Sequence, residues 1–411
     1  MNLLFIVAYV PNLVRVRPYN LIRQLAARGH SVTVCTLWTN EEEKADISRL
    51  ELHNIQVHAF FQAKWRSLWN CILAIPTRLP FQAAFSWNPK LARLLVRQLE
   101  CNGKEGFDVI HVEHLRGARY GVFLKSRFPD TPVVWDSVDC ISYLFEQASG
   151  QSRSGFGKLV TRLDLNRTRR YEGWLPKQVD HVVITSRVDR QALLDLSPDQ
   201  KTAAPISVLP NGVDGEYFKQ NSGIEREPAS VVLSGKMSYH ANVTMALYLI
   251  NEIMPLVWAK RPDTRVSIVG KDPPPAIRAT ANEPRVTVTG TVEDMRPYLQ
   301  KASVAVVPLL YGAGLQNKIL EAMACGTPVV ATPQAVQALD VVPDRDILLG
   351  ASPVDLARQI LRVIEDPDYQ MQVGQAGRCY IEENHQWAKV VKTLEGVYHE
   401  VVSARRERRS Q

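Results

Sequence analysis

The chain has 411 residues, which is long enough for two ordinary domains with separate apolar cores. Apolar residues make up 45% of it and charged residues 22%, a balance that is typical of folded globular proteins and excludes a disordered chain. The net charge of +7 suits an anionic partner, and the six cysteines form no Cys-x-x-Cys pair, which favours reduced thiols over a disulfide framework or a zinc site.

The first half of the chain alternates predicted strands and helices. The opening run LLFIVAYV is apolar throughout, as in a strand buried on both faces, and it lacks the basic flank of a signal peptide, so we expect a cytoplasmic protein. A helix with Leu21, Ile22 and Leu25 on one face follows, and Gly29 ends it before the strand SVTVCTL. Such alternation predicts a parallel, doubly wound sheet over residues 1–210. Its further strands are expected at 55–60, 108–112, 132–136 and 180–186.

The second half repeats this alternation after a polar stretch. Residues 211–229 show no apolar periodicity and are interpreted as a linker. The predicted fold class is therefore α/β, with two Rossmann-like domains facing a central cleft, the second over 230–385. The last helix, within 386–411, has no place in the second domain, and we expect it to cross back to the first. Strands are expected at 230–235, 265–270, 285–290, 303–310 and 327–332, and helices near 241–260 and 293–301.

The segment YGAGLQNKILEAMACGTPVVAT, residues 311–332, carries the strongest chemical signal. Gly312 and Gly314 let a ligand approach the backbone where a buried strand delivers the chain to the carboxyl edge of the sheet. The helix that follows favours phosphate at its amino end, and Lys318 adds a full positive charge there. Glu321 projects from the same helical face and can accept hydrogen bonds from hydroxyls. A phosphate beside a diol indicates a nucleotide; the alternative is an ordinary surface Lys-Glu pair.

A second turn of small residues follows the first strand of the second domain. In Leu233-Ser-Gly-Lys236 a base comes directly after Gly235, so Lys236 and Lys318 would flank one diphosphate if their strands are neighbours.

Asp344-Arg-Asp346 and Asp366-Pro-Asp368 match an Asp-x-Asp metal pattern. Because each lies late in the chain beside a loop or a helix end, we interpret both as accidents of composition.

Basic and aromatic clusters leave the nature of a further partner open. Trp65, Trp69 and the run CILAIP stand beside Lys64, Arg66 and Arg78, a mixture that either packs in the core or enters a membrane interface to meet a lipid-bearing acceptor. Other bunched arginines are either solvated helix faces or contacts for an anionic surface, with nucleic acid the less favoured partner. They are Arg162, Arg167, Arg169, Arg170, Arg405, Arg406, Arg408 and Arg409.

These segments together resemble a known family. LQNKILEAMACGTPVVAT, with LPNGVD before the linker and LAARGHSVTV near the start, is similar to the retaining GT-B glycosyltransferases of family 4. The spacing of Gly314, Lys318 and Glu321 is similar to the bacterial branch found with exopolysaccharide systems. The resemblance covers most of the chain and implies transfer of a sugar, with retention, from a nucleoside diphosphate donor. The acceptor would be a glycan, a lipid-linked sugar or a small molecule, held mainly by the first domain.

The resemblance also implies roles for particular residues. Glu321 would bind the donor ribose, and Lys318 and Lys236 the diphosphate, with Lys318 the catalytic candidate and no metal or other cofactor required. The remaining donor-side candidates are Gly235, Thr291, Val292, Gly312, Ala313, Gly314, Leu315 and Asn317.

In the first domain the resemblance is less complete. The histidine motif near the sugar is replaced by His111-Val-Glu113-His114, so either Glu113 or His114 enters the site as the catalytic candidate, unless His114 is a structural histidine at a strand end. Arg15 and Arg17 are candidate contacts for donor phosphate or an anionic acceptor; the alternative is a surface pair at a helix start.

Two departures from the family pattern bear on the donor. Ala313 stands where many relatives carry the first of two glutamates, so this motif does not specify the sugar. Ala241 replaces the second base of the diphosphate site, so binding would depend more on Lys318 and amide N–H groups. The alternative function is a non-catalytic nucleotide-sugar-binding or membrane-surface protein with a degenerate site. The missing Gly-x-Gly-x-x-Gly argues against a nicotinamide oxidoreductase.

Overall fold

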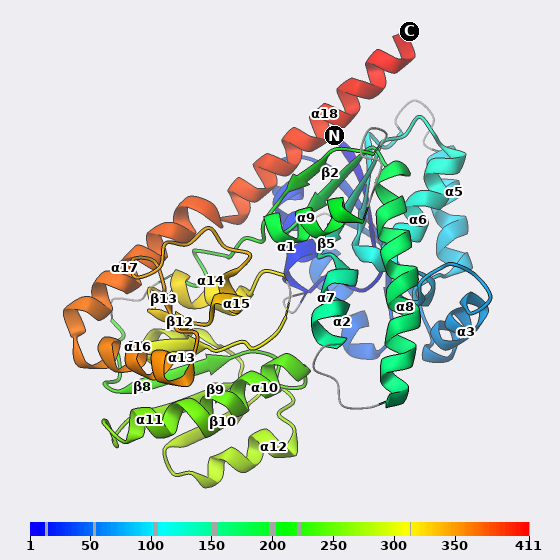
Figure 1. Cartoon of the computed structure of the whole chain (residues 1–411). Helices are drawn as coiled ribbons and strands as arrows, with labels where there is room; N and C mark the ends of the chain where they lie inside the picture. Colours follow the sequence, from blue (N-terminus) through cyan, green and yellow to red (C-terminus); the bar gives the residue numbers. More distant parts are fainter. Residues whose placement is uncertain are drawn as a thin grey trace. The chain divides into compact units, whose positions relative to one another are not determined.

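The computed structural model describes residues 1–12, 15–51, 55–101, 106–149, 155–196, 203–219, 223–312 and 314–410. The chain divides into two compact units, the first made of Met1–Pro210 with Trp387–Gln411 and the second of Asn211–Gln386. Each unit is built on one parallel sheet, which confirms the two Rossmann-like halves predicted from the sequence (Figure 1). Within the described ranges no helix has the length and apolar character needed to cross a bilayer.

The sheet of the first unit has seven parallel strands in the order β3-β2-β1-β4-β5-β6-β7. The strands are β1 (Asn2–Val7), β2 (Ser31–Trp38), β3 (Gln56–Phe61), β4 (Val109–Glu113), β5 (Val133–Val138), β6 (His181–Ile184) and β7 (Ile206–Val208). The six predicted strands of this unit are confirmed to within a few residues. The apolar pattern does not predict β7, because its three residues are too few to show a period.

Side chains of β1 alternate between the two faces of this sheet. Leu3, Phe5 and Val7 pack with apolar residues of α1 and α18, whereas Leu4 and Ile6 pack with those of α5 and α6. Burial on both faces is why the strand has a continuous apolar sequence. The helices of the unit are α1 (Val16–Ala27), α2 (Glu41–Glu51), α3 (Lys64–Ala74), α4 (Phe81–Phe85), α5 (Pro89–Cys101), α6 (His114–Arg127), α7 (Ile141–Ser149), α8 (Gly155–Trp174), α9 (Arg187–Asp195) and α18 (Trp387–Ser410).

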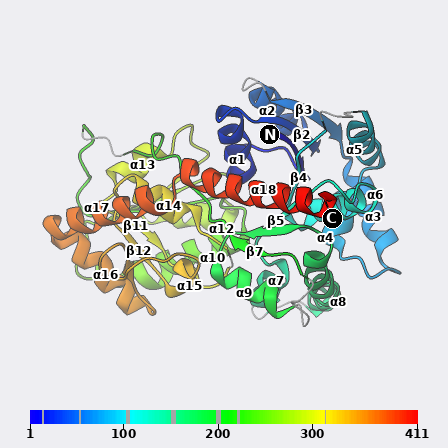
Figure 2. The ribbon, with the colours of Figure 1, turned by 90° about the horizontal axis from the view of Figure 1, so that it is seen from above.

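The last helix, α18, is part of the first unit although the second unit precedes it in the chain. It runs beside α1, as Figure 2 shows. Several of its apolar side chains, among them Leu394 and Tyr398, are buried against the sheet. The Tyr398 hydroxyl lies 2.8 Å from Nδ1 of His111 in β4, in a buried hydrogen bond. A segment distant in sequence therefore completes one face of this core.

The sheet of the second unit has six parallel strands in the order β10-β9-β8-β11-β12-β13. The strands are β8 (Ser230–Ser234), β9 (Arg265–Val269), β10 (Val286–Gly290), β11 (Val304–Val307), β12 (Val329–Ala331) and β13 (Leu348–Leu349). The five predicted strands are confirmed, and β13 is again too short to leave a pattern. The helices are α10 (His240–Tyr248), α11 (Met254–Trp258), α12 (Pro275–Arg278), α13 (Arg296–Lys301), α14 (Asn317–Ala324), α15 (Pro333–Val336), α16 (Pro353–Glu365) and α17 (Pro367–Asn384).

The long helix expected at 241–260 contains one wider turn. A π-helical segment, Leu249–Ile253, joins α10 to α11. Pro255, near the start of α11, has no N–H to donate, and its ring would clash with the carbonyl four residues earlier in a regular α-helix. The wider turn accommodates this proline without ending the helix.

The polar stretch interpreted as a linker is packed on the second unit where the structure describes it. Arg226 donates to the carbonyl oxygens of Ala302 at 2.7 Å and Gly326 at 2.6 Å. The N–H of Glu227 donates to the carbonyl of Lys301 at 2.7 Å. These contacts explain how a stretch without apolar periodicity is nevertheless ordered.

Candidate functional site

The carboxyl edge of the second sheet places two candidate turns side by side. β8 pairs with β11 through Val231 opposite Val304 and Val232 opposite Ala305. The strand order reverses direction between β8 and β11, which is where open α/β sheets bind ligands. Because parallel strands end at the same edge, the Gly235-Lys236 turn lies next to the loop after β11. The neighbour relation that the diphosphate hypothesis requires is therefore confirmed.

Lys318 is held beside both turns. It is the second residue of α14, and its Nζ donates to Oδ1 of Asn242 at 2.9 Å and to Oε1 of Gln316 at 3.1 Å. Asn242, which is buried, donates through Nδ2 to the carbonyl oxygen of Lys236 at 2.9 Å. The chain of hydrogen bonds fixes the Lys318 ammonium relative to the turn after β8.

Two glycines allow the backbone to pack closely around this lysine. Gly235 has a φ of +148°, and a Cβ there would lie 3.0 Å from Nδ2 of Asn242 and 3.4 Å from Cε of Lys318. Gly270, directly after β9, has a φ of +153°, and its Cβ would lie 1.7 Å from the carbonyl oxygen of Gly235. No L side chain fits there, so the turns after β8 and β9 pack backbone against backbone.

The glycine loop after β11 is tied down from neighbouring elements. The carbonyl oxygen of Gly312 accepts hydrogen bonds from Nε2 of Gln334 at 2.7 Å and of Gln337 at 3.2 Å. The Tyr311 hydroxyl bonds the ring of His240 at the start of α10. Ala313, the site of the departure from the family pattern, lies outside the described residues.

Burial changes the acid-base behaviour of Lys318 and Glu321, both of which are half-buried. Burial lowers the pKa of Lys318 to about 8, against the opposing effect of Glu321. Burial raises the pKa of Glu321 to about 7, with Lys318 opposing the shift. A polyanion beside Lys318 would favour its charged form. Such a pair of displaced pKa values at a sheet edge is typical of a functional site.

The other donor-side candidates occupy different positions along this edge. Lys236 is exposed, whereas Gly314 and Leu315, in the loop before α14, are buried. Asn317 accepts a hydrogen bond from Nδ2 of Asn211 at 3.2 Å through its Oδ1. Thr291 is exposed and Val292 half-buried; both follow β10, which lies two strands beyond β8. The structure thus gathers the candidates of β8 and β11 around Lys318 and places the β10 turn further along.

In the first unit, Arg17 is buried rather than on the surface. Its Nε and Nη2 donate to the two carboxylate oxygens of Asp136, at 2.8 Å and 3.1 Å, and its Nη1 donates to the carbonyl oxygen of Leu209 at 2.9 Å. Burial alone would raise the pKa of Asp136, but Arg17 and His111 together hold it below its usual range. Arg17 therefore connects the carboxyl end of β5 to the segment after β7.

Arg15 is half-buried and lies nearer to solvent. Its guanidinium is 2.9 Å from Oε1 of Glu43 and 4.5 Å from the ring centroid of Tyr9. Of the two arginines proposed to contact an anion, Arg15 has the more accessible side chain.

Glu113 ends β4 and His114 begins α6, at the same edge of the sheet, but the two residues have different environments. Glu113 is 2% exposed, and its Oε2 has no hydrogen-bond partner among the described residues. Burial and the charge of Asp136 raise its pKa to about 8. His114 is half-buried in the left-handed conformation, with φ of 61°, and burial with Arg116 lowers its pKa to about 4. His114 therefore presents a neutral imidazole at the edge, and Glu113 is the more deeply buried of the two.

Two family models match the chain in succession. The model described as "Glycosyltransferase Family 4" matches residues 14–217, and the model described as "Glycosyl transferases group 1" matches residues 228–366. Together they account for most of both units, including every candidate residue above. The chain belongs to glycosyltransferase family 4.

Curated relatives of this family 4 protein match over part of their length. The GDP-mannose-dependent monoacylated alpha-(1-6)-phosphatidylinositol monomannoside mannosyltransferase of Corynebacterium glutamicum is 32% identical over 146 residues, 33% of this chain and 38% of its own. The MMP alpha-(1->4)-mannosyltransferase of Mycolicibacterium hassiacum is 25% identical over 240 residues, 55% of this chain and 56% of its own. This chain spans well under two thirds of these relatives.

Solved structures of low identity share the whole fold. Sucrose-phosphate synthase from Thermosynechococcus elongatus superimposes with a TM-score of 0.70 at 17% identity, covering 98% of this chain and 99% of that one. Anabaena HepE, solved in complex with UDP and glucose, gives a TM-score of 0.67 at 15% identity, covering 97% and 100%. These likenesses establish the GT-B architecture of this family 4 protein.

Some residues of the family 4 site are missing from the sequence-based candidates. Asn242 and Asp136 position Lys318 and Arg17, yet each lies far from its partner in sequence. The available signal was a polar residue beside an apolar pattern. Asp136 follows the apolar first three residues of β5, and Asn242 lies in the first turn of α10.

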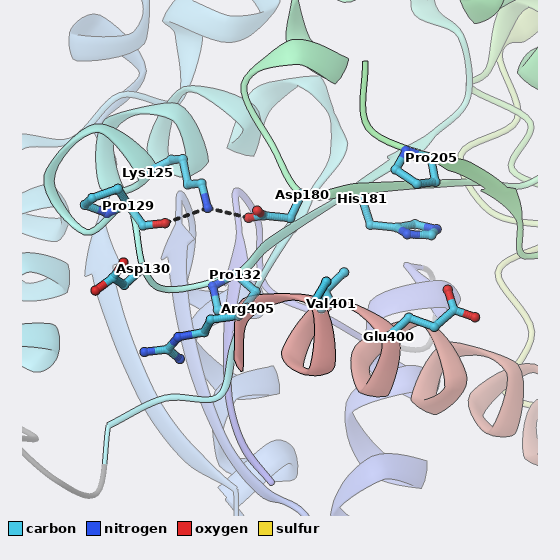
Figure 3. Close-up of a pocket in the computed structure, with 11 residues that line it drawn as sticks. Lys125, Pro129, Asp130, Pro132, Asp180, His181, Pro205, Glu400, Val401 and Arg405 are labelled. Atoms are coloured by element: carbon cyan, nitrogen blue, oxygen red, sulfur yellow. Dashed lines mark hydrogen bonds and ion pairs between the residues drawn. The ribbon is translucent and has the colours of Figure 1, made fainter. Parts of the chain in front are cut away.

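The first unit of this family 4 protein also has a hollow at the amino edge of its sheet, opposite the carboxyl edge that carries His114 and Arg17. Figure 3 shows Lys125, Asp180, His181 and Arg405 around it, at the amino ends of β5 and β6 and beside α18. Lys125 donates to Asp180 at 2.6 Å, and Asp180 also accepts the N–H of Val133 at 2.8 Å. These contacts hold strands and helix together, and the amino edge is not where such sheets bind ligands. We assign no ligand to this hollow.

Proposed function

We propose that this protein transfers a sugar from a nucleoside diphosphate sugar to an acceptor hydroxyl, with retention of anomeric configuration. The observation that supports it most directly is the Lys318 ammonium, held by Asn242 at the amino end of α14 and flanked by glycine turns after β8 and β11. A fixed cation, a helix terminus and an unobstructed backbone suit a diphosphate, and Glu321 one turn later suits the ribose diol.

The names of similar proteins support the donor class and leave its base open. HepE was solved with UDP and glucose, whereas the corynebacterial relative is named as dependent on GDP-mannose. We propose that this chain uses one nucleotide sugar of this kind, and that the Gly290-Thr291-Val292 turn after β10 lies near the base.

Transfer of the sugar requires stabilisation of the nucleoside diphosphate leaving group. As the bond from the sugar's anomeric carbon to the β-phosphate oxygen breaks, its electron pair stays on the phosphate, and Lys318 with the first amides of α14 would stabilise that charge. The acceptor oxygen forms the new bond on the same face, and its proton passes to a phosphate oxygen. Because the protein already supplies positive charge, we propose that transfer requires no metal.

Residues at the carboxyl edge of the first unit are proposed to serve the acceptor side. His114, whose neutral imidazole accepts the N–H of Arg116 at Nδ1 and can donate from Nε2, would contact a sugar hydroxyl, and Arg15 would contact an anionic group. Because Glu113 is buried, we propose that His114 rather than Glu113 makes this contact. The name of the corynebacterial relative gives a phosphatidylinositol monomannoside as its acceptor, so we propose a carbohydrate hydroxyl.

The test is an activity screen with uridine, guanosine and adenosine diphosphate sugars. We expect one donor to give nucleoside diphosphate release, slowly with water and faster with a sugar acceptor, and the rate to be unchanged by a chelator. NMR of the product should show the donor's anomeric configuration. Tight donor binding without any turnover would favour a non-catalytic nucleotide-sugar-binding protein, and an inverted product would refute retention.

The displaced pKa values predict a bell-shaped pH profile. Glu321 must be ionised to accept from the ribose, so kcat/KM should fall as pH drops below about 7. Lys318 must be protonated to hold the diphosphate, so kcat/KM should fall again above about 8. Glu321→Gln should remove the acid limb and leave the alkaline limb in place. A flat profile between pH 6 and 9, roughly the range these two groups span, would contradict the assignment.

A further inference from the structure

The helix α3 carries its apolar side chains on the outside. Trp65, Leu68, Trp69, Ile72 and Leu73 recur at helical spacing along one face, and each is more than half exposed. Together with Phe61 and Ile75 we call these residues the α3 face. The described part of the chain exposes fifteen large apolar side chains, and seven of them lie in this one stretch of fifteen residues. A contiguous apolar surface of this kind is typical of a binding site.

Polar side chains hold α3 in this orientation. Ser67 is buried and accepts from Nε2 of Gln62 at 3.2 Å. Asn70 donates through Nδ2 to the carbonyl oxygens of Phe85 at 3.3 Å and Trp87 at 2.9 Å. Rotating the helix to bury its tryptophans would leave these buried polar groups without partners, which costs free energy. The outward apolar face is therefore fixed by the fold.

The carboxyl end of α3 is also anchored. Arg167 of α8 donates through Nη2 to the carbonyl oxygen of Ile75 at 2.6 Å and through Nη1 to that of Ala74 at 3.4 Å. The guanidinium satisfies carbonyls that the helix end leaves free. α3 thus presents a rigid surface in the protein alone, without a partner to organise it.

The stretch of sequence that contains the α3 face carries charge of one sign. From Leu52 to Leu99 the sequence contains no Asp or Glu, and it contains six basic residues: Lys64, Arg66, Arg78, Lys90, Arg93 and Arg97. Lys64 and Arg78 flank the face at its two ends and are exposed. In a hollow beside α3, Arg66 lies 5.5 Å from the ring centroid of Trp65, and Arg119 lies 4.2 Å from that of Trp87.

We propose that the α3 face docks this protein on an anionic lipid bilayer, with α3 lying in the plane of the interface. Tryptophan and aliphatic side chains on one face of a helix, flanked by Lys and Arg, match the interfacial region of a membrane in both polarity and charge. A protein partner would not require a long surrounding stretch free of acidic residues, whereas an anionic bilayer repels each carboxylate.

Vesicle sedimentation of the full chain tests the proposal. We expect binding to phosphatidylcholine vesicles that contain phosphatidylglycerol, a blue shift of tryptophan fluorescence on binding, and weakening by added salt. The variant Trp65→Ser/Trp69→Ser should bind at least about tenfold more weakly, since it removes the largest interfacial side chains. Lys64→Gln/Arg78→Gln should lose about fivefold per charge on anionic vesicles alone.

The matched control is Val354→Ser/Met371→Ser, which changes two side chains of the second unit that are 57% and 65% exposed. It should bind vesicles as the unaltered protein does. Equal binding by this control and by Trp65→Ser/Trp69→Ser would overturn the proposal. So would absence of vesicle binding together with self-association that the tryptophan changes abolish, since the α3 face would then join two copies of the chain.

Discussion

Replacing Lys318 by methionine is expected to lower kcat for sugar transfer by about a hundredfold to a thousandfold. The substitution removes the charge that stabilises the leaving diphosphate, an electrostatic contribution of that size in other enzymes. Methionine keeps an unbranched apolar stem beside Gly235, so the turn after β8 retains its packing. Steady-state kinetics with the preferred donor measure the effect, and thermal unfolding checks that the second unit still folds cooperatively.

The matched control for this change is Lys260→Met. Lys260 is exposed and lies between α11 and β9, at the amino edge of the same sheet. It should leave both kcat and KM unaltered. Equal rates for Lys318→Met and Lys260→Met would refute the placement of the diphosphate, whatever the identity of the sugar.

Replacing Arg17 by methionine is expected to destabilise the first unit by about 3–5 kcal/mol, because it leaves the buried Asp136 carboxylate without its cation. The side chains of Arg17 and Asp136 are only 4% and 0% exposed. Six tryptophans up to residue 174 lie in this unit, so tryptophan fluorescence during urea unfolding reports mainly on it. The two units require separate transitions in the fit.

Arg15→Met is the matched control, since it removes the same kind of residue from a pair with Glu43 whose arginine is 35% exposed. Its cost should be less than about 1 kcal/mol. Because the pKa of Asp136 is depressed in the folded state, its stabilising contribution is present at neutral pH and is lost as pH falls through that pKa. Equal costs for the two arginine changes would show that Arg17 is no more important than a surface pair.

Local sequence patterns predicted the fold well where strands are long and buried. β1 and β11 appear as continuous apolar runs because they are buried in their sheets, and glycine turns mark the ends of several strands. β7 and β13 were not predicted, because two or three residues are too few to show the alternation of a strand. The π-helical turn before Pro255 was not predicted, because a proline within a helical pattern does not show whether the helix ends, kinks or widens there.

The candidate site was predicted less evenly. Lys318 and Glu321 share one helix, so their proximity follows from spacing alone. Arg17 was expected at a ligand because its partner, Asp136, is 119 residues away and no local pattern reveals the pairing. Whether Glu113 or His114 is accessible to a ligand depends on which side chain is buried. The sequence of two adjacent residues in a strand-to-helix turn does not specify this. The outward orientation of α3 likewise depends on hydrogen bonds from Gln62 and to α4 and its following turn.

The placement of α18 affects how the protein is assembled during synthesis. Leu3, Phe5 and Val7 need residues such as Leu394 and Tyr398 to cover their side of the sheet. Those residues leave the ribosome only after the whole of Asn211–Gln386 has emerged and can fold as a contiguous segment. Until α18 is made, one apolar face of the first sheet stays uncovered, and we expect a chaperone that binds apolar surface to act on that face.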